Sequence, residues 1–210
     1  MIGDIMSISR LRMASDGNGV STLVAFFGCP LKCKYCLNDH CHDRKRSLRE
    51  TKRGAYTPEM LYEKVRIDDI YFKMTGGGVV FGGGEPLMQA AFIHELCGLF
   101  DPLWKKRMET SLYSEWENVR MLLKDIDEWI IDIKDINPAK YEKYTGRKNR
   151  AVVLNLKHLL KEVPVESVRV RVPHIKGFNN DDDVKRTVAF LLQMGVVNID
   201  EFTYIQTRRL

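Results

Sequence analysis

Three of the five cysteines in the chain lie within one short stretch, as Cys29, Cys33 and Cys36. They directly follow residues 20–27, a run of β-branched and aromatic side chains that predicts a buried strand. The cysteines therefore lie on a loop that leaves the end of a strand. Such a loop can wrap a metal centre and present several thiolates to it from one side.

The cysteine spacing leaves the kind of centre open. A disulfide framework does not fit, because the cysteine count is odd and the chain does not begin with a signal-peptide pattern. A structural zinc site would need a fourth ligand, which His40, Cys41 or His42 could supply. An iron–sulfur cluster held by three thiolates would leave one iron open to a substrate. Spacing alone does not decide between zinc and iron.

Composition limits the function classes. The 210 residues predict a single domain over 1–210, in which residues 28–41 form the metal-binding loop. No apolar run approaches the roughly 20 residues that span a bilayer. Free cysteines predict a reducing, cytoplasmic location. The net charge of +5 is too small to indicate nucleic-acid binding.

Strand and helix patterns alternate about six times along the chain, which predicts a parallel α/β sheet with right-handed crossovers. We expect strands near 5–12, 20–27, 79–81, 106–110, 129–134, 168–172 and 199–205, and helices near 58–70, 88–99, 115–123, 138–144, 153–160 and 181–194. The polar residues 39–55, with a basic run near 45–53, predict an irregular solvated loop.

Polar and glycine residues follow several of these strands. Residues 82–85 come directly after one strand, and glycines there let another molecule approach the backbone closely. Asp132 and Lys134 end another strand and share one face of it, as a binding site or as a plain ion pair. Arg171 lies on a third strand. The carboxyl ends of parallel strands meet at one edge, so we expect these residues and the cysteine loop to form one site.

Taken in order from about residue 12 to residue 180, the motifs resemble those of the radical S-adenosylmethionine (radical SAM) superfamily. Within it, they are most similar to the glycyl-radical-enzyme activases of the pyruvate formate-lyase activating type. The matching segments are Asp16-Gly17-Asn18-Gly19, Cys29-x3-Cys33-x2-Cys36 with Tyr35, Gly82-Gly83-Gly84-Glu85-Pro86, Asp132-Ile133-Lys134, and Arg171-x-Pro173 with Gly177-x-Asn179.

The resemblance implies a partial (β/α)6 TIM-like barrel that forms a single radical SAM domain. It implies a [4Fe-4S] cluster on Cys29, Cys33 and Cys36 whose open iron binds S-adenosylmethionine (SAM). One electron from the cluster would cleave SAM to methionine and a 5′-deoxyadenosyl radical. In the activases that radical takes a hydrogen atom from a backbone glycine of a partner enzyme. The implied partners are a glycyl-radical enzyme and an electron donor such as flavodoxin or ferredoxin.

The resemblance also assigns roles to single residues. The amino group of SAM would be contacted by Gly83, Gly84 and Glu85, and other polar parts of SAM by Asp132, Lys134 and Arg171. Tyr35 and Asn38 would lie near SAM. Asp16 would face the peptide of the partner enzyme.

Three positions depart from the family pattern. The resemblance implies a monovalent cation beside SAM, bound by Glu109, Thr110 and Asp132, yet family members often carry Asp-Thr where this chain has Glu-Thr. Leu37 stands where pyruvate formate-lyase activators have His, and Tyr204 or Gln206 where activases place another His. Two alternatives stay open: a radical SAM enzyme acting on a small molecule or nucleotide, and a non-catalytic module with a zinc-stabilised loop.

Overall fold

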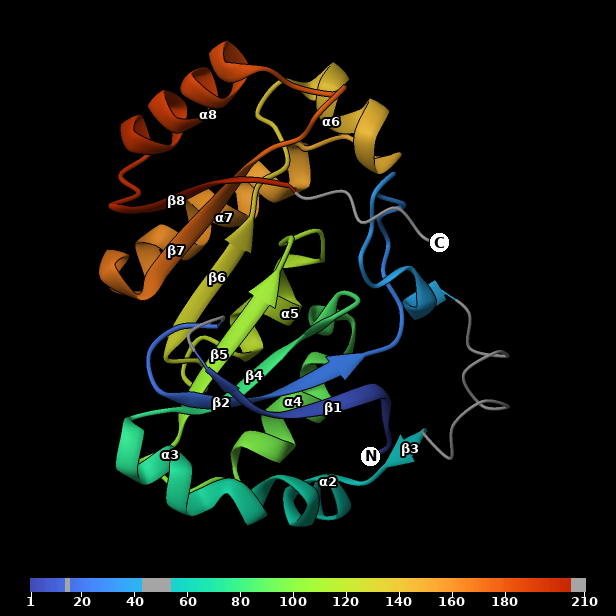
Figure 1. The fold of residues 1–210 in the computed structure, drawn as a ribbon, viewed down its shortest axis with the longest axis vertical. Helices are drawn as coiled ribbons and strands as arrows, with labels where there is room; N and C mark the ends of the chain where they lie inside the picture. The colour runs from blue at the N-terminus through green and yellow to red at the C-terminus, as the bar shows by residue number, and fades with distance from the viewer. Residues whose placement is uncertain (14–15, 43–53, 205–210) are drawn as a thin grey trace.

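The computed structural model describes residues 1–13, 16–42 and 54–204. Within them, eight strands form one sheet in the order β3-β1-β2-β4-β5-β6-β7-β8 (Figure 1). The strands are β1 (Gly3–Met13), β2 (Val20–Phe26), β3 (Ala55–Tyr56), β4 (Gly78–Gly83), β5 (Lys105–Thr110), β6 (Glu128–Asp132), β7 (Val168–His174) and β8 (Asn198–Thr203).

Each neighbouring pair from β2 through β4 to β8 is parallel, whereas β1 pairs antiparallel with β2 and with β3. Six parallel strands in this order confirm the expected partial (β/α)6 arrangement. The helices are α2 (Pro58–Val65), α3 (Asp69–Thr75), α4 (Ala90–Cys97), α5 (Trp116–Met121), α6 (Pro138–Thr145), α7 (Arg150–Glu162) and α8 (Asp181–Gln193), with 3-10 turns at Asp39–His42, Arg66–Asp68, Pro86–Gln89 and Val165–Ser167.

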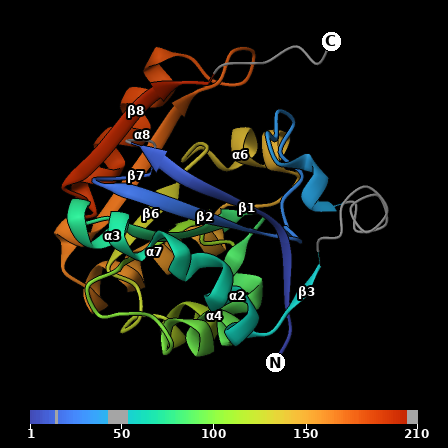
Figure 2. The ribbon, with the colours of Figure 1, turned by 60° about the horizontal axis from the view of Figure 1, so that its bottom comes forward.

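The sheet curls so that its strands turn progressively from β1 and β2 to β8, with α2, α4 and α7 outside the curve (Figures 1 and 2). The strand core is as apolar as its sequence predicts. Trp129, Ile130 and Ile131 of β6 are almost wholly buried, as suits a parallel strand covered on both faces. Apolar burial of this kind is the dominant favourable contribution to the stability of the domain.

The helix expected over 58–70 is divided in the structure. Its start is as predicted, since Pro58 takes the first helical position and the Thr57 hydroxyl accepts a hydrogen bond from the Met60 amide at 3.2 Å. Helix α2 ends at Val65, a 3-10 turn follows, and α3 continues to Thr75. The break occurs at Asp68, whose carboxylate turns inward to partners on two strands.

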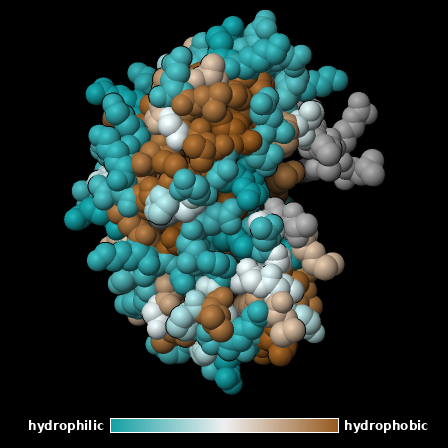
Figure 3. All heavy atoms as spheres, turned by 90° about the vertical axis from the view of Figure 1, so that its left-hand side faces the viewer, coloured by the Kyte–Doolittle hydropathy of each residue, from teal (hydrophilic) through white to brown (hydrophobic). Residues whose placement is uncertain are grey.

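Two sequence-based expectations lie outside the described residues, namely the basic run near 45–53 and the role suggested for Gln206. On the face shown in Figure 3, apolar surface gathers in the upper half, the part of the molecule that holds β8 and α8 in Figure 1. Leu192 of α8 and Val197, just before β8, are each more than half exposed. Within the described ranges, none of the helices has the length and apolar character to cross a membrane.

Candidate active site

A cavity of about 290 Å³ opens at the carboxyl ends of the parallel strands. It collects residues from the cysteine loop and from the ends of β4, β6 and β7, which were expected to meet there, and the ends of β5 and β8 complete it. Its lining consists of Cys29, Leu31, Cys33, Cys36, Leu37, Asn38, Gly83, Gly84, Glu85, Glu109, Thr110, Ser111, Asp132, Lys134, Tyr144, Arg171, Phe202 and Tyr204.

The cysteine loop is fixed to its surroundings by backbone hydrogen bonds. At its start, the Gly28 amide donates to the Cys41 carbonyl at 2.9 Å, which closes the loop on itself. At its middle, the Lys32 amide donates to the Thr145 carbonyl at 2.8 Å, at the end of α6. Because both ends and the middle are tied to protein backbone, the loop can present its three thiols to the cavity in a fixed arrangement.

The three thiols have the chemistry that an iron–sulfur cluster requires. Burial raises the pKa of Cys29 to about 12 and that of Cys33 to about 11, with the Lys134 ammonium partly offsetting the rise at Cys33. Thiols in such a setting ionise when a metal replaces their protons. Among the described residues, no three His, Cys, Asp or Glu side chains converge closely enough to hold a single metal ion. Three thiols that line one cavity from a single loop are a donor set that fits an iron–sulfur cluster.

The glycine-rich end of β4 lies against the root of this loop. The Glu85 amide donates to the Gly28 carbonyl at 2.7 Å, and the Gly84 amide donates to the Phe26 carbonyl at 3.0 Å. A Cβ on Gly84 would lie 2.1 Å from the Gly28 oxygen, and Gly83 has a φ of +93° that side chains rarely adopt. These positions therefore require glycine, and they leave the backbone itself facing the cavity.

The Glu85 carboxylate braces the end of β4 against the end of β5. One oxygen accepts from the Thr110 hydroxyl at 2.5 Å, and the other accepts from the Ser111 amide at 3.0 Å and the Ser111 hydroxyl at 2.6 Å. Burial raises the pKa of Glu85, and these neutral donors only partly offset the rise. Glu85 lines the cavity as predicted, but its oxygens are committed to holding the turn.

The charged strand ends form two ion pairs within the cavity. Lys134 Nζ lies 3.1 Å from Asp132 Oδ2, so the shared face predicted from their spacing is confirmed. Arg171 Nη1 lies 2.8 Å from Glu109 Oε1. Burial lowers the pKa of Lys134 and of Arg171, but the neighbouring acids more than offset this, so both cations keep their protons. The cavity thus carries two fixed positive charges.

The structure places the weaker candidates differently. Asn38 lines the cavity, whereas Tyr35 is absent from the described lining. The Tyr35 ring packs edge-on against Tyr144 and Phe178, and its carbonyl accepts a hydrogen bond from the Tyr204 hydroxyl. Tyr35 thereby joins the cysteine loop to the end of β8. Its role beside SAM stays a prediction.

Asp16 lies in the turn before β2 and is almost fully buried. Its carboxylate accepts hydrogen bonds from Arg12 at 2.5 and 2.6 Å and from the Ser21 hydroxyl at 2.9 Å. Contact between this carboxylate and a partner peptide would require these bonds to be shared or broken. The contact of Asp16 with the partner stays a prediction.

Some lining residues carried no distinct signal in the sequence. Ser111 supplies two of the bonds to Glu85, and its only clue was its place directly after the strand 105–110. Tyr144 and Phe202 give the cavity aromatic surface, although each reads in the sequence as an ordinary core residue. Their contribution follows from contacts between segments far apart along the chain.

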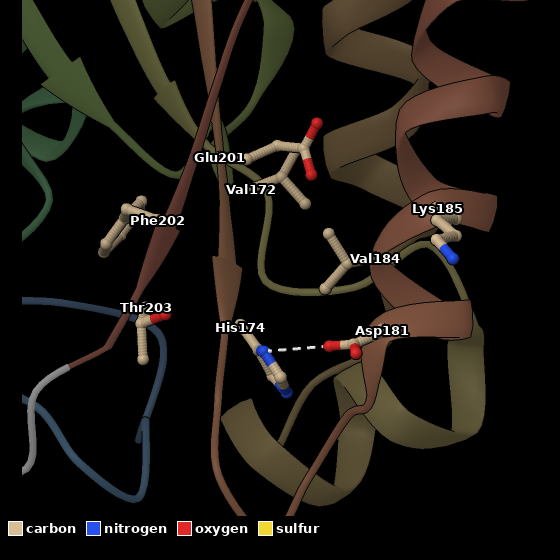
Figure 4. A pocket seen from close by; sticks show the side chains of 8 residues that line it. All are labelled: Val172, His174, Asp181, Val184, Lys185, Glu201, Phe202 and Thr203. Atoms are coloured by element: carbon tan, nitrogen blue, oxygen red, sulfur yellow. Dashed lines mark ion pairs between the residues drawn. The ribbon is translucent and has the colours of Figure 1, made fainter.

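A second cavity, of about 310 Å³, lies between the strands β7 and β8 and helix α8 (Figure 4). Its polar groups include His174 and Asp181, whose Nδ1 and Oδ1 atoms are 3.3 Å apart, and the side chains of Lys185 and Glu201. This ion pair is exposed to solvent, and the described lining holds no thiol. The site chemistry predicted from the sequence belongs to the first cavity.

Comparison with known proteins gives a consistent result. The sequence model of the radical SAM superfamily matches residues 23–191. Among curated proteins, the chain is 26% identical to the isethionate sulfite-lyase activating enzyme of Nitratidesulfovibrio vulgaris, over 86% of this chain and 78% of the relative. It is 29% identical to the trans-4-hydroxy-L-proline dehydratase activating enzyme of Clostridioides difficile, over 90% of this chain and 80% of the relative.

Solved structures show the same fold. Streptococcus suis SuiB superimposes with a TM-score of 0.65 at 15% identity, over 86% of this chain and 38% of that chain. The structure described as native anSMEcpe with bound AdoMet superimposes with a TM-score of 0.59 at 18% identity, over 84% of this chain and 49% of that one. At such low identity these likenesses describe the fold and not the reaction.

Proposed function

The chain belongs to the radical SAM superfamily, and from this premise we propose that it activates a glycyl-radical enzyme. When bound, the [4Fe-4S] cluster and SAM supply the chemistry, which is reductive cleavage of the sulfonium bond of SAM. The products are methionine and a 5′-deoxyadenosyl radical, which takes a hydrogen atom from the substrate. The relatives are activating enzymes named for a lyase or a dehydratase, which supports a protein substrate. The observation that carries the proposal is the convergence of three thiols, a bare glycine backbone and two fixed cations around one cavity.

The cysteine loop would hold the cluster. Cys29, Cys33 and Cys36 would supply three thiolates to it, which would leave one iron open to SAM. The loop is anchored through Gly28 and Lys32, and the neighbouring Lys134 ammonium favours the thiolate form of Cys33. These residues do not take part in bond breaking. They set the position of the cluster and balance its charge.

The glycine turn and the charged strand ends would bind SAM. The backbone at Gly83 and Gly84 can accept hydrogen bonds from the amino group, because close approach is possible where no side chain intervenes. Lys134 can pair with the carboxylate of SAM, while Asp132 and Arg171 bind further polar parts of it. Glu85 supports this arrangement by fixing the turn through Thr110 and Ser111. Tyr35 and Asn38 would flank the cofactor.

The remaining roles concern the partners. We propose a flavodoxin or a ferredoxin as the electron donor, and a glycine on a loop of the glycyl-radical enzyme as the site of hydrogen abstraction. Asp16 is the proposed contact to that loop. Leu31, Phe202 and Tyr204 contribute apolar and aromatic lining that would help to exclude water from the radical.

Two measurements test this function. The anaerobically reconstituted and reduced chain should convert SAM to 5′-deoxyadenosine and methionine, which chromatography detects. Mixed with candidate glycyl-radical enzymes, it should generate a glycyl signal in electron paramagnetic resonance. SAM cleavage with no glycyl signal on any candidate would favour a small-molecule or nucleotide substrate. A colourless chain that carries zinc and neither iron nor sulfide would contradict the enzyme assignment altogether.

A further inference from the structure

The suggested ligands of the monovalent cation implied by the resemblance are already paired with other side chains of the protein. Of its three suggested ligands, Glu109 pairs with Arg171, Asp132 pairs with Lys134, and the Thr110 hydroxyl donates to Glu85. The residues as found do not fit a bound metal ion. We propose that Arg171, held in place by Glu109, supplies the positive charge beside SAM, so that this chain binds SAM without an alkali metal ion. The inference rests on the proposed binding of SAM in this cavity.

The geometry of the sheet explains how the pair forms. Strand β6 lies between β5 and β7, so Glu109 and Arg171 must reach across it to meet. Their atoms nevertheless come within 2.8 Å, because both side chains are long. Glutamate has one methylene more than the aspartate common in the family. An aspartate on β5 would hold its carboxylate closer to its own strand, short of the guanidinium.

The same carboxylate also occupies space above β4. A Cβ added to Gly82 would come within 3.1 Å of Glu109 Oε2 and 3.3 Å of Glu109 Cβ. Glu109 thus lies close to β4 while it pairs with Arg171 of β7. Its side chain is 23% exposed and that of Arg171 is 18% exposed, so the pair is largely shielded from bulk solvent.

The charges favour a built-in cation over a bound one. Arginine keeps its proton under all ordinary conditions, and its planar donors suit a carboxylate. Asp132 and Asp200 add further negative charge near Arg171, and Arg171 Nε lies 3.9 Å from Asp200 Oδ2. A hard cation requires several oxygen ligands that are free to turn toward it. A metal ion here would compete with Lys134 and Arg171 for those oxygens and be repelled by both.

Glu109 is therefore a positioning residue, since it acts on SAM through Arg171. The proposal is tested first on the unaltered protein. The affinity of the cluster-loaded chain for SAM is measured by calorimetry under anaerobic conditions, in choline chloride and in potassium or sodium chloride at equal ionic strength. We expect the dissociation constants to agree within about threefold. A larger, saturable tightening by either metal would overturn the inference, whereas no SAM binding in any salt would overturn the proposed function instead.

A conservative variant gives the second test. Glu109→Asp shortens the acid and should release Arg171, so SAM binding in choline chloride should weaken roughly tenfold and recover at least in part with sodium or potassium. Sodium-23 line broadening should accordingly rise for Glu109→Asp above the wild-type level, a change that a merely structural role would not produce.

Glu201→Asp is the matched control, because it makes the same change on strand β8, next to the β7 strand of Arg171, at a side chain that faces α8 (Figure 4). It should leave both readings at the wild-type level. A Glu109→Asp variant that binds SAM as tightly as the wild type in choline chloride would contradict the inference. If that variant does not fold, the salt comparison on the wild type still decides.

Discussion

Two buried acids, one beside α3 and the other at the end of β4, have different kinds of hydrogen-bond donors, and their pKa values shift in opposite directions. Asp68 is fully buried, and its carboxylate accepts from Arg10 at 2.5 to 3.1 Å and from the Thr22 hydroxyl at 2.7 Å. Burial alone would raise the pKa of Asp68, but Arg10 and Thr22 more than offset this, so it falls. Glu85 is equally buried, yet its donors are hydroxyls and amides, and its pKa rises.

The difference separates a structural ion pair from a site held ready for a ligand. At Asp68 the charge is balanced within the protein, and the group closes the junction between α2, α3 and the strands β1 and β2. At Glu85, neutral donors hold the carboxylate in place. The cations Lys134 and Arg171 line the same cavity but pair with other acids, Asp132 and Glu109. A bound ligand can therefore meet the cations without disturbing the brace.

The strongest test of this division uses two cysteines, one in the cavity lining and one in the core. Cys33→Ala should abolish reductive SAM cleavage, because the cluster would lose one of its three ligands. Cys97→Ala removes a thiol of the α4 core that lies outside the cavity lining, and it should leave cleavage largely intact. Product analysis by chromatography measures both. Equal loss in the two variants would show that the ligands are misassigned.

The next effect concerns the structural side of the comparison. Asp68→Asn removes the charge facing Arg10 and should lower the free energy of unfolding by about 1–3 kcal/mol. Since the pKa of Asp68 is lowered in the folded chain, its contribution is present above the unfolded value of 3.8 and is lost as pH falls through the folded value. Urea titration measures it.

Glu63→Gln serves as the control for Asp68→Asn, because Glu63 forms an exposed ion pair with Arg66 at 2.7 Å. It should change stability by no more than about 1 kcal/mol. SAM affinity should be unchanged in both variants. A loss of SAM binding in Asp68→Asn without a loss of stability would remove the distinction between the two regions.

The smallest predicted effect concerns the direction in which stability changes with pH, which is opposite for Glu85 and Asp68. The pKa of Glu85 is raised above its ordinary value of 4.5, so between 4.5 and the folded value the native chain holds more protons than the unfolded one. Stability should therefore decline as pH rises through this range, by up to about 1.4 kcal/mol per pH unit. Glu85→Gln should reduce this decline, leaving the part due to Glu109 and Asp135, whose pKa values burial also raises, while Asp68→Asn should retain it in full. Urea titrations of the cofactor-free chain across this range would show either result.

Much of the fold and part of the site could be predicted from local patterns. The apolar run ending in Asp132 and Lys134 and the cysteine spacing are both local, and the structure brings them to the same cavity. The break at Asp68 could not be predicted, because Arg10 and Thr22 lie 58 and 46 residues away. The same holds for the bonds from Ser111 to Glu85, 26 residues apart, and from Tyr204 to Tyr35, 169 residues apart. Contacts of this kind depend on the strand order.

The hydrogen bond between Glu85 and Gly28 has a consequence for a chain that has lost its cluster to oxygen. The root of the cysteine loop and the glycine turn are joined through the Glu85 amide, a link that does not depend on iron. A molecule whose cluster has been destroyed should therefore keep the glycine turn that we propose binds SAM. We expect such molecules to be recharged with iron and sulfide, without unfolding or new synthesis.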